Sequence, residues 1–141
     1  FEEALTVVNF VDHPNEYAML QNNLGNALQY VSSSHRVENG YRALEAYDEA
    51  LKVRTVQDMP EEYANTIANK ANCLSNLPDD PSNPDGGNFA NLGESVRLLE
   101  EAHAIFSSRG SAEKARSVAE AIAELTEAMG PSTILERSGL Q

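Results

Sequence analysis

Residues 58–77 decide how the whole chain is interpreted, and they read DMPEEYANTIANKANCLSNL. Asparagines recur along this stretch at spacings of four, three and four residues, and we call them the asparagine row: Asn65, Asn69, Asn72 and Asn76. On a helix these spacings place the side chains along one face. An apolar stripe runs beside them: Ile67, Ala71 and Leu74. Asparagine is a mediocre helix former, because its side chain competes for backbone hydrogen bonds, so the row indicates a role beyond helix stability.

The same pattern occurs once before in the chain. When the sequence is shifted by 46 residues, residues 47–77 align without gaps on residues 1–31. Pro60 then falls on Pro14 and Tyr63 on Tyr17. The equivalents of Asn69 and Asn72 are Asn23 and Asn26. A period of this size is typical of a repeat architecture.

Composition narrows the class of protein. At 141 residues the chain is long enough for one domain with a real core, and its low aromatic content of 6%, without Trp, suits helix packing better than a β-sandwich. A net charge of −12 argues against nucleic acid and against an anionic membrane surface as partners. It favours a basic, polar or mixed partner. The single cysteine, Cys73, allows no internal disulfide.

The sequence bears on cellular location only through signals that it lacks. No run is apolar enough to span a bilayer and no signal peptide is visible, so we expect a cytoplasmic protein. The chain begins in the middle of a repeat, which indicates a fragment of a longer protein whose targeting signals could lie upstream.

Helical periodicity and turn residues divide the chain into predicted elements. Helices are predicted at 14–31, 41–56, 60–77, 91–107 and 112–129, with loops at 32–40 and 78–87. The repeats follow: the end of one at 1–11, one at 14–56, one at 60–108, and the first helix of another at 111–129. Asp12 and Asp58 are predicted to cap the helices that follow them.

The helix at 14–31 has two predicted stripes. Its packing face should hold Leu20, Leu24, Ala27, Leu28 and Val31. Its second stripe, equivalent to the asparagine row, should hold Met19, Asn23, Asn26 and Tyr30.

This organisation resembles the tetratricopeptide repeat. The matching residues in the first helix are Leu24-Gly25 and Leu28, those in the second are Ala43, Tyr47 and Ala50-Leu51, and Pro60 matches the closing proline. The phrases NNLGNA (22–27) and ALKVRT (50–55) look like those of bacterial tandem repeats. The period is longer than usual and looks like that of kinesin light chain. The resemblance implies an all-α solenoid of antiparallel helix pairs with a concave groove.

The resemblance also implies a binding mode. In kinesin light chain and in the repeats of O-GlcNAc transferase, an asparagine before the Leu-Gly position lines the groove and bonds the backbone of an extended peptide. Asn23 and Asn69 occupy that position here. Asn26 also matches an asparagine of the chaperone-type carboxylate clamp, but Asn22 stands where that clamp has a lysine.

The predicted peptide-binding residues therefore lie on two helices: Asn23, Asn26, Asn65, Asn69, Asn72, Asn76, Met19 and Tyr30. A carboxamide can both donate to and accept from a peptide backbone. The competing interpretation is a solvated surface. Met19 and Tyr30 would add apolar contacts to a peptide or pack locally.

Catalytic and metal sites have no support in the residues. The three histidines, His13, His35 and His103, show no ligand spacing, and Cys73 is expected to be a small buried side chain. The acidic loop at 78–87 does not fit an EF-hand. We therefore predict no enzyme activity, no cofactor and no metal.

Two functions remain open from the sequence. The first is a protein-interaction scaffold or adaptor that holds an extended peptide in its groove. The second is a regulatory module of a larger enzyme, for example beside a caspase-like protease domain. In either case, the end repeats lack neighbours and should favour self-association.

Overall fold

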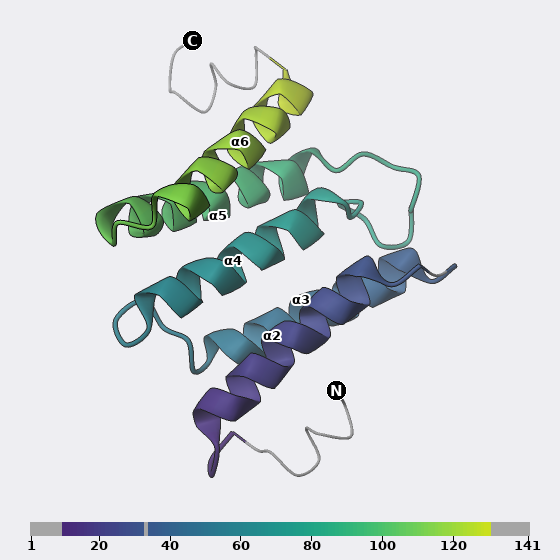
Figure 1. Ribbon diagram of the computed structural model, residues 1–141. Coiled ribbons are helices and arrows are strands. Elements are labelled where there is room, and N and C mark those ends of the chain that lie inside the picture. Colours follow the sequence, from purple (N-terminus) through teal and green to yellow (C-terminus); the bar gives the residue numbers. More distant parts are fainter. Residues whose placement is uncertain (1–9, 33, 131–141) are drawn as a thin grey trace.

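The computed structural model describes residues 10–32 and 34–130, which form helices without any strand (Figure 1). The helices are α2 (Pro14–Tyr30), α3 (Arg36–Leu51), α4 (Pro60–Ser75), α5 (Phe89–Ser108) and α6 (Ala112–Met129). The predicted all-α class is therefore confirmed. Most of the predicted repeat end at 1–11 lies outside the described residues.

Local signals explain most helix ends. Pro14 and Pro60 start α2 and α4, where a missing backbone N–H costs nothing. The predicted caps are wrong, because His13 and Met59 occupy the N-cap positions and neither makes a side-chain cap hydrogen bond. Gly110 follows α5 with φ of +77°, a conformation that favours glycine and ends the helix.

The largest boundary error concerns α3, which begins and ends five residues before the predicted 41–56. Gly40 suggested a loop in the sequence, but it lies inside α3 and is buried. A Cβ atom on Gly40 would come within 2.5 Å of the Leu77 side chain. Its lack of a side chain therefore serves close packing and not a turn.

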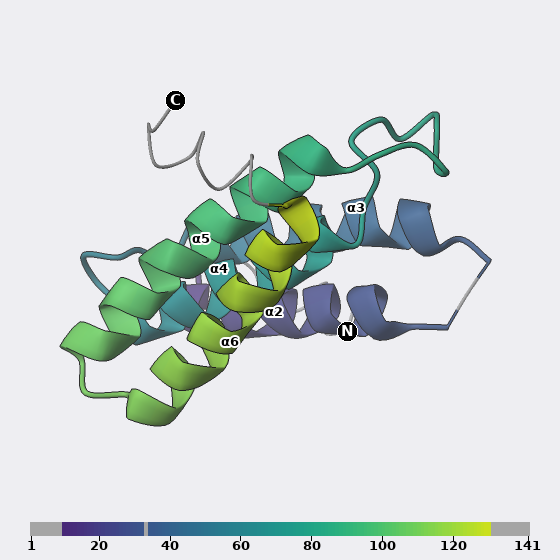
Figure 2. The ribbon, with the colours of Figure 1, turned by 90° about the horizontal axis from the view of Figure 1, so that it is seen from above.

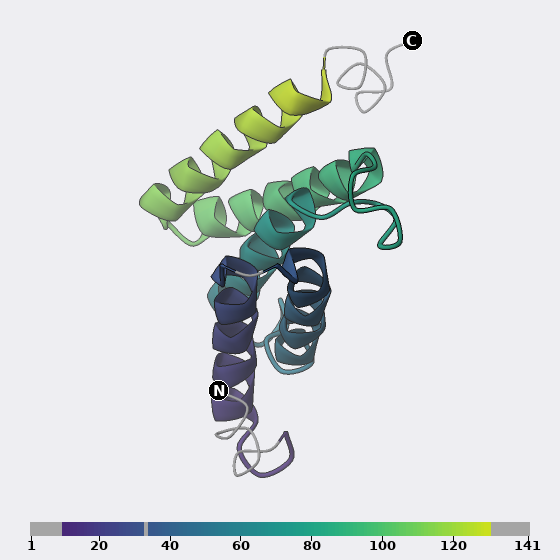
Figure 3. The ribbon, with the colours of Figure 1, turned by 90° about the vertical axis from the view of Figure 1, so that its right-hand side faces the viewer.

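Each described helix packs against the next one in the chain, so the helices form a continuous stack (Figures 1 and 3). The start of α2 lies beside the end of α3, where the Tyr17 hydroxyl donates a hydrogen bond of 2.6 Å to Glu49. The start of α4 lies beside α5 in the same way, and the Tyr63 hydroxyl donates to Glu101 at 2.7 Å. The repeat found in the sequence thus reappears as a repeated contact.

The apolar core is concentrated in the second half of the stack. A cluster of buried residues joins α4, α5 and α6: Ala64, Ile67, Ala71, Leu74, Leu98, Leu99, Ala102, Phe106, Ala115 and Val118. A smaller cluster joins α3 to α4 and to Leu77, just after α4: Ala43, Tyr47, Cys73 and Leu77. Gly25 and Gly40 lie directly against the side chains of Tyr47 and Leu77, which lets these helices approach closely.

The predicted packing face of α2 is wrong in phase. The buried residues of this helix are Ala18, Gln21, Asn22 and Gly25. The predicted leucines, Leu20, Leu24 and Leu28, are only half-buried, while Ala27 and Val31 are exposed. The reason is that Asn22 is buried against α4, where its Oδ1 accepts hydrogen bonds from Thr66 and Asn69. Leu28 lies toward α3 and packs only partly against the smaller apolar cluster.

The α4–α5 loop lies at the same end of the molecule as the start of α3 (Figure 2). Asp79 holds it in place by accepting hydrogen bonds from the backbone N–H groups of Ala90 (2.9 Å) and Asn91 (2.8 Å). These are groups at the start of α5 that the helix itself leaves without partners. The acidic loop therefore closes a helix end. None of the described helices is long and apolar enough to cross a membrane.

Candidate functional site: a groove between α4 and α6

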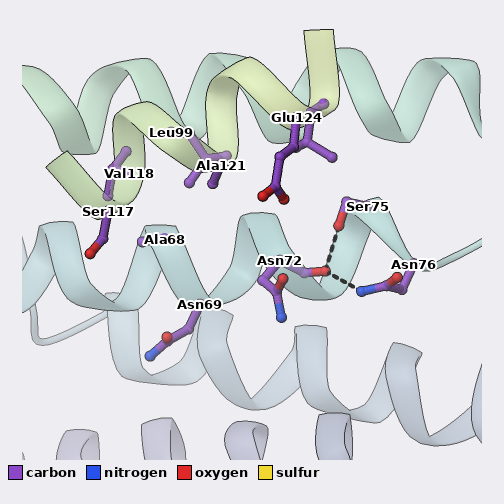
Figure 4. Close-up of a pocket in the computed structure, with 11 residues that line it drawn as sticks. Ala68, Asn69, Asn72, Ser75, Asn76, Leu99, Ser117, Val118, Ala121 and Glu124 are labelled. Atoms are coloured by element: carbon purple, nitrogen blue, oxygen red, sulfur yellow. Dashed lines mark hydrogen bonds between the residues drawn. The ribbon is translucent and has the colours of Figure 1, made fainter. Parts of the chain in front are cut away.

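A cavity of about 360 Å³ lies between α4 and α6, and we call it the α4–α6 groove (Figure 4). From α4 it is lined by Ala68, Asn69, Asn72, Ser75 and Asn76. From α6 it is lined by Ser117, Val118, Ala121, Glu124 and Leu125, and Leu99 of α5 completes it. One wall is therefore polar and the other mostly apolar.

Three members of the asparagine row line this groove, and the fourth, Asn65, does not. Asn76 is fixed by a local bond, in which its Nδ2 donates to the backbone oxygen of Asn72 at 2.9 Å. The Ser75 hydroxyl donates to the same oxygen at 2.8 Å (Figure 4). Ser75 and Asn76 therefore each donate to the protein's own backbone.

The amide nitrogens of the other two members point to α2. The Nδ2 of Asn69 donates to Asn22 Oδ1 at 3.2 Å. The Nδ2 of Asn72 donates to Gln29 Oε1 and, at 2.9 Å, to the hydroxyl of Tyr30. In Figure 4 the nitrogen of Asn72 points away from α6. Asn69 and Asn72 thus bind α4 to α2 through their nitrogens, and in Figure 4 the oxygen of Asn72 lies nearer α6 than its nitrogen does.

Asn26, the equivalent of Asn72, is engaged inside the first helix pair. Its Oδ1 accepts a 2.6 Å hydrogen bond from the Tyr47 hydroxyl, which in turn accepts from Gln29 Nε2 at 2.9 Å. Tyr47 is fully buried, and this burial raises its pKa well above the ordinary value. We refer to the hydrogen-bonded side chains that join α2, α3 and α4 as the amide cluster: Asn22, Asn26, Gln29, Tyr30, Tyr47, Thr66, Asn69 and Asn72.

The predicted set of eight site residues is therefore divided. Asn69, Asn72 and Asn76 line the groove, while Asn26 and Tyr30 belong to the amide cluster. Met19, Asn23 and Asn65 do not line the groove. Met19 is 47% exposed on α2, and Asn23 and Asn65 are half-buried.

Sequence reasoning missed the α6 side of the groove. Val118 and Leu125 were visible as apolar positions of a helix, but nothing marked Glu124 as a groove residue. The asparagines that marked the first helices of the two earlier repeats are absent from α6. The only available signal was the expected place of α6 as the first helix of a further repeat.

The reactive groups of the described residues are few. Cys73 is 2% exposed, and its thiol donates to the backbone oxygen of Gly40 at 3.3 Å. Burial raises the pKa of this thiol to about 11, so it is protonated and unreactive at neutral pH. Among the residues that the structure describes, no group of three or more His, Cys, Asp and Glu side chains could hold a metal ion.

No protein-family model, curated protein or solved structure matches this chain. The functional interpretation therefore depends on the helical stack and on the chemistry of the α4–α6 groove.

Proposed function

We propose that this chain is a non-catalytic protein-interaction scaffold, built as a tetratricopeptide-like solenoid of antiparallel helix pairs, that binds an extended peptide in the α4–α6 groove. The observation that carries the proposal is the row of Asn69, Asn72 and Asn76 along one wall of this groove. The carboxamide oxygens of such a row can accept hydrogen bonds from peptide N–H groups. The apolar wall supplied by Val118, Ala121 and Leu125 can cover peptide side chains.

The dimensions suit a short segment. The 16 residues of α4 span about 24 Å at the rise of an α-helix. An extended peptide advances about 3.3 Å per residue, so about seven residues would run the length of this helix. A segment of this size is recognised by its backbone and by a few side chains, which agrees with a groove that has one polar and one apolar wall.

The direct test blocks the groove. A random peptide library of about seven residues is first screened for binders of the whole chain. Ala121→Phe then fills the groove from α6, and Ala123→Phe is the matched control, because Ala123 is exposed and does not line the groove. We expect Ala121→Phe to abolish peptide binding measured by fluorescence anisotropy, with helicity retained by circular dichroism. Equal binding by the two variants would refute the groove as the site.

A milder test addresses the asparagine row. Asn76→Ala removes one groove carboxamide, and Asn65→Ala removes the row member that does not line the groove. Since one hydrogen bond contributes about 0.5–1.5 kcal/mol, Asn76→Ala should weaken binding about two- to tenfold and Asn65→Ala should leave it unchanged. Asn69 and Asn72 are less suitable because they also bond α2. Equal affinities of the two variants would count against a role for the row.

A further inference from the structure

The α4–α6 groove is richer in hydrogen-bond acceptors than in free donors. The amide nitrogens of Asn69, Asn72 and Asn76 each donate within the protein, and Asn72 uses its nitrogen twice, whereas their three oxygens can accept from a ligand. The hydroxyl hydrogen of Ser75 is also used internally. On the opposite wall Glu124 is a carboxylate, which only accepts when ionised, and Figure 4 shows it directed toward α4. The Ser117 hydroxyl of α6 also lines the groove and can donate.

We infer that the occupant of this groove is a basic segment, with a Lys or Arg cation held between Glu124 and the carboxamide oxygens of the asparagine row. This inference rests on the proposed function and adds the chemistry of the partner. A cation brings several N–H donors and no acceptor, which is the complement of this wall. A carboxylate in the same place would face Glu124 and the amide oxygens and would be repelled.

The charges around the groove favour the same partner. Among the described residues that line it, Glu124 alone carries a charge. Glu120 and Glu127 lie one turn away on the same side of α6 and are exposed. The chain's net charge of −12 adds a longer-range attraction for cations.

The nearby basic residues are directed elsewhere or lie outside the lining. Lys114 at the start of α6 lies over the ring of Phe106, 5.6 Å from its centroid. Lys70 of α4 is paired with Asp48 at 2.7 Å. Arg116 of α6 is exposed and does not line the groove. A basic segment would therefore meet no lysine or arginine in the groove wall.

The experiment compares three pools of random peptides in which alternate positions are fixed as Lys, Gln or Glu. The whole chain is titrated against each pool by fluorescence anisotropy at low salt. We expect the Lys pool to bind most tightly and the Glu pool most weakly. Adding about 0.5 M NaCl should remove most of the difference between the Lys and Gln pools, since exposed charges are screened at that ionic strength.

Two matched variants locate the cation. Glu124→Gln keeps the size of the side chain and removes the charge, and Glu120→Gln does the same one turn away, outside the lining. Glu124→Gln should lower the affinity for the Lys pool about two- to fivefold, the range expected for the loss of one partly exposed ion pair. It should leave the affinity for the Gln pool unchanged. Glu120→Gln should change the affinity for the Lys pool by less than Glu124→Gln does.

The outcomes separate this inference from the proposed function. If the Gln pool binds as tightly as the Lys pool and Ala121→Phe abolishes both, the groove binds peptides but the basic partner is wrong. An equal effect of Glu124→Gln and Glu120→Gln on the Lys pool would also overturn the inference. If none of the three pools binds, both the inference and the proposed function fail.

Discussion

The two helix pairs of this chain carry the same asparagine at the same repeat position and use it differently. In the first pair the hydroxyl of Tyr47 on α3 donates a 2.6 Å hydrogen bond to the carboxamide oxygen of Asn26 on α2. Residues 99–102 (LEEA) resemble residues 47–50 (YDEA), which places Leu99 of the second pair on Tyr47 and Glu101 on Glu49. Leucine has no hydroxyl, so Asn72 keeps its oxygen for the groove that Leu99 also lines.

A second difference accompanies the first. Gly25 of α2 corresponds to Ala71 of α4. A Cβ on Gly25 would come within 2.5 Å of the Tyr47 ring, whereas Ala71 and the smaller Leu99 belong to the same buried cluster. The comparison teaches that a repeated residue is only a potential binding group. The side chain opposite it decides whether it bonds within the fold or faces a ligand.

The largest expected effect on stability concerns the apolar core of the second helix pair. Phe106 of α5 is 2% exposed and packs in the cluster of α4, α5 and α6. The equivalent position in the first pair is Arg54, which follows α3 and is half-buried. Phe106→Ala should lower the free energy of unfolding by about 3–5 kcal/mol, because it leaves a cavity in the core. Urea denaturation followed by circular dichroism measures this.

The control for this prediction is Phe89→Ala, which removes the same side chain where it is 55% exposed. Its effect should be within about 1 kcal/mol of zero, as for most surface substitutions. Similar losses for the two variants would mean that the second pair is not held by buried apolar contacts.

The next effect concerns Cys73, which is buried although its repeat equivalent, Ala27, is exposed. Burial raises the pKa of the thiol from the ordinary 9.0 to about 11. Above pH 9 the unfolded chain loses this proton while the folded chain keeps it, so stability falls as pH rises and the loss is complete near pH 11. A difference of this size corresponds to about 2–3 kcal/mol.

The measurement compares the original chain with Cys73→Ala, since the tyrosines Tyr17, Tyr47 and Tyr63 also have raised pKa values and contribute above pH 10. From about pH 8 to pH 11 the original chain should lose about 2–3 kcal/mol more than Cys73→Ala. Parallel pH profiles of the two proteins would show that the thiol is accessible to water.

The third prediction tests the fit of Gly25 against Tyr47. Gly25→Ala should destabilise the chain by about 1–3 kcal/mol through overpacking, although alanine is the better helix former. Adding Tyr47→Leu reproduces the Ala71–Leu99 arrangement of the second pair. The double variant should therefore cost less than the sum of the two single variants in a double-mutant cycle. Strict additivity would mean that the two positions do not contact each other.

The accuracy of the sequence predictions followed the kind of signal behind them. Helices α4 and α6 were predicted nearly to the residue, since prolines, glycines and a helical period mark them. The buried face of α2 was predicted wrongly, because the rule that leucines face the core does not anticipate a buried Asn22. This residue lies against Thr66 and Asn69 of α4. Such pairings depend on which helices become neighbours, and a local period carries no information about that.

The candidate site shows the same division. The period placed the asparagine row on one side of α4, where Asn69, Asn72 and Asn76 line the groove and Asn65 does not. Whether these residues bind a peptide stays a prediction. The period could not predict that Asn26 would be engaged by Tyr47, which lies 21 residues away in the chain. Glu124 was missed for a related reason, since its importance depends on the distance between two helices and not on its own neighbours in sequence.

The smallest effect, and the one closest to the opening comparison, is expected from Tyr47→Phe. The hydroxyl of Tyr47 donates to Asn26 and accepts from Gln29, so its removal deprives both side chains of a partner. Gln29 keeps a second acceptor, the backbone oxygen of Asn69 at 3.3 Å, which limits the loss. The ring remains, so the packing against Gly25 is unchanged. The free energy of unfolding should fall by about 0.5–1.5 kcal/mol.

The binding side of this prediction separates the two halves of the molecule. Asn26 does not line the α4–α6 groove, so a peptide that binds there should keep its affinity for Tyr47→Phe within about twofold, the effect of a few tenths of a kcal/mol. The comparison variant is Tyr63→Phe, which removes the equivalent kind of hydroxyl in the second pair, where it donates to Glu101. Both variants should lose stability and keep binding. If Tyr47→Phe instead lowered the peptide affinity as much as Asn76→Ala does, the amide cluster would be part of the binding site. The distinction between a first pair whose asparagine bonds within the fold and a second pair whose asparagine faces the groove would then be wrong.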